Sequence, residues 1–364
     1  MYRGPNDLQV ETLPVPKISS KELLVRVAVC GVCPTDIKKI HYGTFAPPRV
    51  FGHETAGTVV RAGALVRGFR AGDRVALHHH VPCMDCHACL HRAFAQCVQY
   101  KRTGITAGFE PAGGGYAQYV RVMPFVLPGV VKIPDRNTFS EGAMLEPLNT
   151  VLKGVRRLSL LPKDVVLVSG QGPIGLMFTR LLALQGVTVI ATDLLDRRLK
   201  LARSLGAKHI HAAAAVPSDS SNKVPGTDSS AASLEALVQR VTRGRALDAA
   251  VIAVPSAAVM LQAQRLTRGG GQVLLFSHTK RGESSELDLA TICVDEKDLI
   301  GSYSADFTLQ AEVARLIFSR KLDARRLITH EFPLEQTAGA VNLAAHPTAD
   351  SLKVTVNQSN PNSD

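Results

Sequence analysis

The chain has 364 residues, a formal net charge of +11 and seven cysteines. This length predicts two domains, each large enough for its own core. The basic residues are scattered, with no aromatic-interleaved patch, so we expect no nucleic-acid partner. No uninterrupted apolar stretch reaches the ~18 residues of a membrane span, and Met1–Val10 has no apolar signal region. We therefore expect a cytoplasmic protein without a membrane partner, in a compartment that keeps thiols reduced.

The first third of the chain has the pattern of a strand-rich domain. Valine-rich apolar runs between glycines and prolines predict strands over Glu22–Val29, Thr58–Val66 and Asp73–Leu77.

Three short motifs in and just after this region carry candidate zinc ligands: Cys33-Pro34-Thr35-Asp36, Gly52-His53-Glu54 and Glu146-Pro147. A catalytic zinc site uses three protein ligands of mixed type and leaves one position for water or substrate. Taken singly, each residue has another explanation. His53 could be a satisfied core histidine, Cys33 a small buried residue and Glu146 a surface charge.

Four cysteines follow the third predicted strand with the spacing C-x2-C-x2-C-x7-C: Cys83, Cys86, Cys89 and Cys97. Four thiolates that close a short loop satisfy a tetrahedral structural zinc ion. The bacterial ferredoxin pattern is C-x2-C-x2-C-x3-C-P, which this spacing does not match. Disulfides do not suit an odd number of clustered cysteines without a secretory segment. We therefore predict a structural zinc site.

A continuous apolar run, Val165–Ser169, leads into Gly170-Gln171-Gly172-Pro173-Ile174-Gly175 and an apolar helical segment, Leu176–Leu184. A strand followed by G-x-G-x-x-G and a helix is the context of a dinucleotide fingerprint. A second strand, Val187–Ala191, precedes Asp193, about 20 residues beyond the glycines, where the ribose-binding acid is expected. The predicted pyrophosphate site at the helix N-terminus comprises Gly170, Gly172, Pro173, Ile174 and Gly175.

The charge near the end of that second strand bears on the choice of cofactor. Asp193 would accept hydrogen bonds from a free ribose 2′-hydroxyl and repel a 2′-phosphate, which favours NAD over NADP. Arg197 and Arg198 could bind such a phosphate, or they could belong to the solvated first turn of the next helix. We predict NAD, with Arg198 as a further cofactor-binding residue.

From about Leu148, strands alternate with helical segments, which predicts a parallel sheet. Strands over Ala249–Ala253 and Gln272–Phe276 continue the pattern. Ala212–Ser233 is rich in alanine and serine, and we interpret it as a flexible surface insertion. The last residues, Asn357–Asp364, are expected to be a disordered tail.

The order of these motifs resembles the zinc-dependent medium-chain dehydrogenase/reductase family, the alcohol dehydrogenase superfamily, over almost the whole chain. The matching segments are Cys33-x-Thr-Asp, Gly52-His-Glu, the four cysteines, Gly170-x-Gly-x-x-Gly, Gly269-Gly270-Gly271 and Ile300-Gly301-Ser302-Tyr303. Glu146-Pro147 is similar to the polyol branch typified by sorbitol dehydrogenase and the related threonine dehydrogenases. The resemblance implies an α/β fold. In this fold, residues 1–148 form a GroES-like β-rich catalytic domain, to which residues 305–364 return. Residues 149–304 form a doubly wound Rossmann cofactor domain with a parallel sheet.

The resemblance also implies roles for the candidate ligands. Cys33 and His53 are expected to hold a catalytic zinc ion permanently, with either Glu54 or Glu146 as the third ligand. Asp36 is expected to orient His53, as carboxylates behind metal-bound histidines commonly do.

The implied reaction is hydride transfer between a secondary alcohol and NAD, with zinc acting as a Lewis acid on the hydroxyl group. Thr35 is expected to pass the hydroxyl proton toward the nicotinamide ribose. Several alcohol dehydrogenases have a histidine where this chain has Lys38. His41 could take its place, or it could be a surface histidine.

The predicted enzyme is a zinc-containing polyol dehydrogenase with two zinc ions per chain and a small alcohol or ketone as substrate. Alternatives in the same superfamily are an NADP-dependent enzyme and a threonine or amino-alcohol dehydrogenase. A non-catalytic zinc-binding interaction protein would not need the mixed ligand set and a complete nucleotide fingerprint together. The family further implies a homodimer or homotetramer, paired through an edge strand near Leu299–Ser304.

Overall fold

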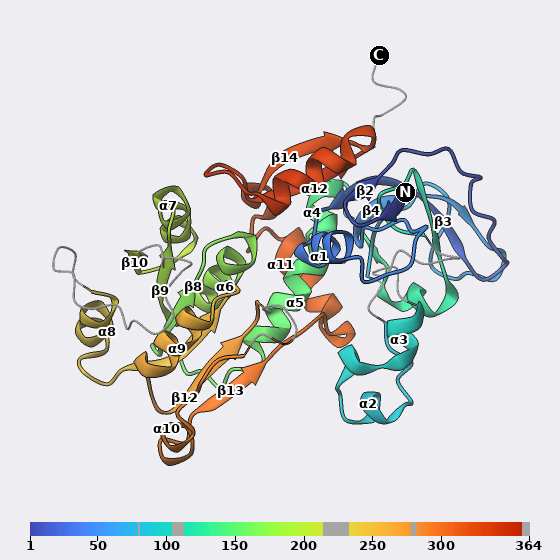
Figure 1. Ribbon diagram of the computed structural model, residues 1–364. Coiled ribbons are helices and arrows are strands. Elements are labelled where there is room, and N and C mark those ends of the chain that lie inside the picture. Colours follow the sequence, from blue (N-terminus) through green and yellow to red (C-terminus); the bar gives the residue numbers. More distant parts are fainter. Residues whose placement is uncertain (79–80, 104–112, 214–232, 278–281, 283, 359–364) are drawn as a thin grey trace. The chain divides into compact units, whose positions relative to one another are not determined.

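Two sheets organise the chain, each within its own compact unit (Figure 1). The structure is a computed structural model that describes residues 1–78, 81–103, 113–213, 233–277, 282 and 284–358. Unit 1 comprises Met1–Thr150 with Ser304–Asp364, and unit 2 comprises Val151–Tyr303. The sequence-based expectation places the boundaries after residues 148 and 304.

Unit 1 is built on a seven-stranded sheet of order β14-β15-β3-β4-β5-β7, with β6 also paired to β3. Its strands are β3 (Leu23–Gly31), β4 (Glu54–Ala62), β5 (Arg74–Leu77), β6 (Tyr119–Val122), β7 (Val131–Lys132), β14 (Ile328–Pro333) and β15 (Lys353–Asn357). A separate hairpin joins β1 (Tyr2–Gly4) to β2 (Asp7–Leu8). The last strand, β15, runs antiparallel to β3, so the C-terminal segment completes the sheet that the N-terminal segment begins.

The helices of unit 1 are short. They are α1 (Pro34–Tyr42), α2 (His87–Leu90), α3 (Val98–Thr103), α4 (Phe139–Ala143), α11 (Gln310–Phe318) and α12 (Thr337–Ala345), and α5 (Leu145–Val155) continues into unit 2. The main core of the unit gathers apolar side chains from β3, β4, β5 and β6, among them Val25, Val59, Val75 and Val120.

The strand predicted over Thr58–Val66 is shifted in the structure. It spans Glu54–Ala62, because Glu54 already pairs with Gly31 at the end of β3 and a turn begins at Gly63, whose carbonyl accepts a hydrogen bond from the Val66 amide at 2.9 Å. Glu54 is therefore a strand residue.

Unit 2 contains a six-stranded, all-parallel sheet of order β10-β9-β8-β11-β12-β13. The strands are β8 (Val165–Ser169), β9 (Thr188–Asp193), β10 (His209–Ala212), β11 (Leu247–Ile252), β12 (Thr267–Leu275) and β13 (Asp298–Gly301). The helices are α6 (Pro173–Leu184), α7 (Asp196–Leu205), α8 (Leu234–Thr242), α9 (Ala257–Leu266) and α10 (Leu289–Val294). This is the doubly wound order 3-2-1-4-5-6, so the expected parallel sheet is confirmed, and its topological switch point lies between β8 and β11.

All five residues of β8 are buried, which explains why the strand appears in the sequence as an unbroken apolar run. Within the described residues, none of the helices combines the length and apolar character needed to cross a bilayer. Residues 214–232 of the expected insertion and 359–364 of the expected tail lie outside the described residues. The predicted ends of these segments were wrong, because Ala212 belongs to β10, Ser233 caps α8 and Asn357 belongs to β15.

Candidate metal centres and cofactor site

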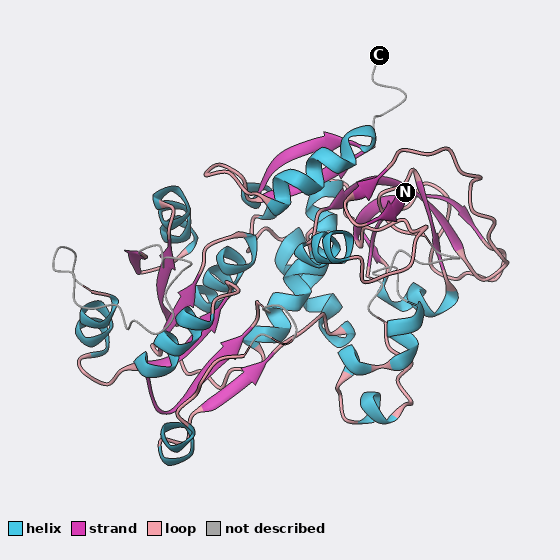
Figure 2. Ribbon diagram, in the orientation of Figure 1, coloured by secondary structure: helices cyan, strands magenta, loops and turns pink. Residues whose placement is uncertain are grey.

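The four clustered cysteines come together around α2 and α3. The described part of this lobe consists of helices and loops (Figures 1 and 2). The Sγ–Sγ distances are 3.9 Å between Cys83 and Cys89, 3.5 Å between Cys86 and Cys89, and 3.6 Å between Cys97 and Cys83. Zn–S bonds of ~2.3 Å in a tetrahedron place sulfur atoms ~3.8 Å apart. The lobe thus presents four sulfur atoms at the spacing that one zinc ion requires.

The lobe has little apolar material of its own. Among the described residues, its buried cluster comprises Cys89, Phe94, Cys97 and Tyr100, with Cys83 and Cys86 packed beside it. Burial opposes ionisation of the Cys97 thiol, but backbone hydrogen bonds from Tyr100 and Cys83 lower its pKa to about 7. Cys97 is therefore prepared for the thiolate form that binds metal.

A second group of metal-binding side chains lies at one end of the β3–β4 pair. Cys33, His53 and Glu54 place a ligand atom each within 4.8 Å of one another. Cys33 precedes α1 and is partly exposed, whereas His53 and Glu54 are buried at the start of β4. A thiol, an imidazole and a carboxyl group from three chain positions thus converge on one point.

His53 is fixed from behind by a buried carboxylate. Its Nδ1 lies 3.0 Å from Oδ1 of Asp36, and both side chains are almost fully inaccessible to solvent. Asp36 and Ile40 are the buried residues of α1, and their spacing of four places them on the same helical face. Burial alone would raise the pKa of Asp36 and lower that of His53. Their mutual attraction prevails, so the pKa of Asp36 is lowered and that of His53 is raised well above its usual value.

This contact also sets the tautomer of His53. With Nδ1 directed at the carboxylate, Nε2 is the ring nitrogen available on the opposite side. Thr35 lies on that side, with Oγ1 3.5 Å from Nε2 of His53 and 3.2 Å from Sγ of Cys33. The structure thus brings together Cys33, Thr35 and Asp36 of the first predicted motif with His53 and Glu54 of the second.

The carboxyl group of Glu54 contacts a lysine from the far end of the sequence. Lys353, the first residue of β15, forms an ion pair with Glu54, and its Nζ donates a hydrogen bond to the Val32 carbonyl at 2.9 Å. Burial opposes the charge on Lys353, but Glu54 and then Cys33 raise its pKa overall. Lys353 is absent from the residues predicted from the sequence, because no local motif links it to a residue about 300 positions away.

Glu146 lies in the first turn of α5 and is buried, but it is not part of the group formed by Cys33, His53 and Glu54 within the described chain. Burial is the largest cause that raises its pKa, and repulsion from Glu54 adds to it, so the pKa rises to about 7 despite the nearby His53. A buried carboxyl group that is repelled by a second one favours a bound cation nearby.

His41, the candidate for the end of the proton relay, lies on the surface. Its Nδ1 is 3.2 Å from Oδ1 of Asn6, and both side chains are exposed.

The dinucleotide fingerprint lies at the C-terminal end of β8, beside the switch point of the parallel sheet. Gly170 has φ +89°, a conformation that favours glycine. A Cβ at Gly175 would lie 1.7 Å from the Gly170 carbonyl oxygen, so only glycine allows α6 to approach the strand this closely. A Cβ at Gly172 would meet open space, which leaves the backbone there accessible to a ligand. Pro173 and Ile174 form the first turn of α6, whose N-terminus attracts anions.

Asp193 is the last residue of β9 and is largely buried. Its Oδ2 accepts a hydrogen bond from the Gln171 amide at 2.6 Å, and its Oδ1 accepts one from the Leu195 amide at 2.9 Å. Arg198 lies beside it, with Nη1 4.0 Å from the Asp193 carboxylate. Asp193 therefore connects the end of β9 to the glycine turn through its hydrogen bond with Gln171.

Comparison with known proteins shows the family of this chain. Residues 19–135 match the alcohol dehydrogenase GroES-like domain, and residues 173–319 match the zinc-binding dehydrogenase domain. An L-idonate 5-dehydrogenase from Vitis vinifera is 30% identical over 341 residues, which are 92% of this chain and 87% of that protein. The chain belongs to the alcohol dehydrogenase superfamily.

Two further members of the superfamily resemble the chain over nearly its full length. A sorbitol dehydrogenase from Bombyx mori is 29% identical over 98% of this chain and 97% of that protein. The solved structure of a zinc-binding dehydrogenase from Sinorhizobium meliloti 1021, bound to NADP, has a TM-score of 0.82 and 26% identity and covers 98% of this chain and 97% of that one.

Membership of the alcohol dehydrogenase superfamily confirms the predicted pair of a GroES-like domain and a Rossmann-type sheet. It also confirms an oxidoreductase with zinc and NAD(P) as cofactors and a small alcohol as substrate. The residues of this chain fit those cofactors. The sulfur spacing in the lobe suits zinc, and the open space at Gly172 suits a pyrophosphate.

Proposed function

We propose that this protein oxidises a secondary hydroxyl group of a polyol to a ketone, with NAD as hydride acceptor. The observation that carries the proposal is the convergence of Cys33, His53 and Glu54, with the Asp36 carboxylate fixing His53 from behind. The polyol class is supported by the similarity to sorbitol dehydrogenase and L-idonate 5-dehydrogenase sequences along nearly the whole chain.

Cys33 and His53 would hold the catalytic zinc ion, with either Glu54 or Glu146 as the third ligand. Cys83, Cys86, Cys89 and Cys97 would hold the structural zinc ion. When bound, the catalytic zinc would supply a Lewis acid for the substrate hydroxyl, and the nicotinamide would supply the hydride acceptor.

The chain itself positions the ligands and handles the proton. Asp36 keeps Nε2 of His53 directed at the metal position, and because both groups are buried, water does not compete for this contact. Thr35 has its hydroxyl within 3.5 Å of both Cys33 Sγ and His53 Nε2, so it can accept the proton that the substrate hydroxyl loses. Oxidation then yields a ketone, a reduced nicotinamide and one released proton.

The cofactor would bind at the glycine turn of unit 2. Gly170, Gly172 and Gly175, with Pro173 and Ile174 at the start of α6, would face the pyrophosphate. Asp193 would bind the ribose hydroxyls and disfavour a 2′-phosphate, which supports NAD over NADP. Arg198 beside it would contact the same ribose.

The first test is a spectrophotometric assay of nicotinamide reduction, run with NAD and NADP in parallel. The substrate panel contains sorbitol, galactitol, L-idonate, threonine and simple secondary alcohols. We expect turnover of polyols with NAD, loss of turnover on chelation, and its recovery on addition of zinc. Cys33→Ser should abolish turnover while NADH binding persists. Turnover of threonine alone, or turnover that chelation leaves unchanged, would overturn the proposal.

We further propose a cytoplasmic homo-oligomer. The support is an edge strand, β13 (Asp298–Gly301), at one end of the unit 2 sheet, next to exposed apolar side chains such as Tyr303. Light scattering coupled to size exclusion, with Leu299→Glu as the variant, tests it. A dimer or tetramer that the variant dissociates supports the proposal, and a monomeric wild type contradicts it.

A further inference from the structure

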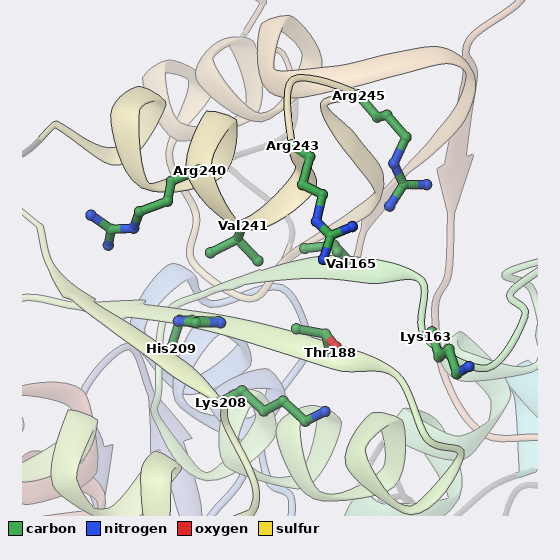
Figure 3. A pocket seen from close by; sticks show the side chains of 9 residues that line it. All are labelled: Lys163, Val165, Thr188, Lys208, His209, Arg240, Val241, Arg243 and Arg245. Carbon is green, nitrogen blue, oxygen red and sulfur yellow. The ribbon is translucent and has the colours of Figure 1, made fainter.

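A groove lined by basic side chains lies at the N-terminal edge of the parallel sheet in unit 2 (Figure 3). We call it the N-edge groove, and it is lined by Lys163, Val165, Thr188, Lys208, His209, Arg240, Val241, Arg243 and Arg245. Val165, Thr188 and His209 are the first residues of β8, β9 and β10. Figure 3 shows the residues of α8 and of the loop after it on one side, and those of the strand starts on the other.

The charged residues that line this groove are all positive. Five of its nine lining residues are lysine or arginine, and none is acidic. Among the ion pairs of the described residues, none involves Lys163, Lys208, Arg240, Arg243 or Arg245. Five cations that surround one space without a carboxylate repel one another, so the groove favours an anion.

Interaction with the C-terminal end of α8 explains the presence of only some of these five cations. Arg240 lies in the last turn of α8, and the Arg245 Nε donates a hydrogen bond to the Thr242 carbonyl at 3.2 Å, so both stabilise the negative end of that helix. Lys163 and Lys208 belong to other segments, just before β8 and β10, and cap nothing in α8. Their convergence on the same groove needs another reason.

The pKa of His209 is affected by the positive charge of the groove. Burial is the main cause that lowers the pKa of its imidazole, and the charges of Arg240 and Lys208 lower it further. The imidazole ring lies among the cationic side chains and, with Val165 and Val241, gives the groove an apolar portion.

The groove is separate from the dinucleotide fingerprint. Gly170 follows the C-terminal end of β8, whereas Val165 begins that strand, so the five residues of β8 separate the two places. At ~3.3 Å per residue, this is roughly 15 Å. The cofactor of the proposed reaction therefore does not account for the cations at the N-terminal edge.

We propose that the N-edge groove binds a small ligand that carries several linked phosphates. The volume of about 570 Å³ fits a ligand of nucleotide size. Arginine and lysine donors from two sides match the oxygen atoms of a phosphate chain. The two sources of such a chain are an inorganic polyphosphate and a nucleoside polyphosphate, for which the partly exposed Val241 and His209 would offer a surface to the base.

The test is calorimetric titration of the full-length protein with tripolyphosphate and, separately, with ATP, in saturating NADH so that the fingerprint is blocked. The variant is Arg243→Asn combined with Lys208→Gln. Asparagine is chosen because Arg243 has φ 54°, which asparagine tolerates. Lys21→Gln combined with Arg67→Gln is the control, since both are exposed cations of unit 1 outside the groove. Thermal unfolding of each variant without ligand checks that it folds.

We expect the groove variant to weaken binding at least tenfold and the control variant to change it less than twofold. Tighter binding of ATP than of tripolyphosphate would identify a nucleotide as the ligand, and equal binding would identify the phosphate chain alone. Equal weakening in both variants would overturn the proposal, as would the absence of binding below millimolar concentration. Binding of an oligonucleotide without binding of either phosphate compound would also overturn it and assign the groove to nucleic acid.

Discussion

Asp36 and His53 form the most buried polar contact of the candidate catalytic group, and both side chains are almost fully inaccessible to solvent. Asp36→Asn keeps the size of the side chain but removes its charge. We expect zinc to bind ~10–100-fold more weakly, because a neutral amide no longer fixes the tautomer and orientation of His53. The measurement is zinc content as a chelator of known affinity is added.

Tyr116→Phe is the matched control for this experiment. The Tyr116 hydroxyl lies 3.4 Å from the other oxygen of Asp36, at the limit of a hydrogen bond, so its loss should change zinc affinity much less. Unchanged zinc affinity in Asp36→Asn would show that His53 is held by other contacts.

Gly31 is a second residue on which the group depends. A Cβ at this position would lie 1.9 Å from the Glu54 carboxylate and 2.9 Å from Lys353 Cε. We expect Gly31→Ala to lower the free energy of unfolding by ~1–3 kcal/mol and to reduce turnover, because Glu54 must move. Urea denaturation and the nicotinamide assay measure the two effects. Gly4→Ala, where a Cβ would meet no atom within 4 Å, should change neither.

The sequence revealed those site residues that stand in compact motifs. Cys33, His53 and Asp36 lie in two short segments with recognisable ligand types, and the structure brings them together. Lys353 could not be found this way, because its contact with Glu54 depends on the pairing of β15 with β3 and not on any spacing. The N-edge groove could not be predicted from the sequence either, because its lysines and arginines come from separate segments that only the folded sheet brings together.

We expect the four-cysteine lobe to depend on its metal. Cys89→Ser should lower the melting temperature and release one zinc ion per chain, because the few buried apolar residues of the lobe cannot order it alone. Differential scanning calorimetry and metal analysis test this. Cys293→Ser, at an exposed cysteine outside the lobe, is the control. Retained stability and zinc content in Cys89→Ser would argue against a structural metal.

The start of α4 gives a pH-dependent prediction. Glu141 accepts hydrogen bonds from the Thr138 amide at 2.7 Å and from Arg320 Nε at 2.9 Å, as part of a capping box. Burial opposes ionisation of Glu141, but Arg320 and the Thr138 amide lower its pKa below the usual 4.5. A lowered folded-state pKa stabilises the fold above the unfolded-state value, and this contribution is lost as the pH falls through the folded-state pKa.

Glu141→Gln removes that contribution. The difference in free energy of unfolding between wild type and variant should therefore be largest near neutral pH and shrink as the pH falls below about 4.5. Urea midpoints measured between neutral and acidic pH provide the test. A difference that stays constant over this range would contradict the assigned role of the charge.

Strands β8, β9 and β11 of unit 2 could be predicted because almost all of their residues are buried, so they appear in the sequence as apolar runs. In unit 1 the pattern was less informative. The start of β4 lies in Glu54-Thr55-Ala56-Gly57, which lacks an apolar run, and only its pairing with β3 defines it as a strand.

The zinc ligands and the fingerprint belong to different units. Zinc chelation should therefore speed amide hydrogen exchange in the four-cysteine lobe and at the start of β4, and leave β8 and β11 unchanged. Hydrogen-exchange mass spectrometry with and without a chelator measures this. Equal deprotection of the parallel sheet would show that the two units do not unfold independently.

The discontinuity of unit 1 has a consequence for biosynthesis. Its sheet closes only when β15 joins β3, so the ribosome must release nearly the whole chain before Lys353 can reach Glu54. Unit 2 is a single continuous segment and can fold while the final sixty residues are still being translated. The nucleotide-binding half is thus ready first, and the reactive centre matures last, after its final strand has left the ribosome.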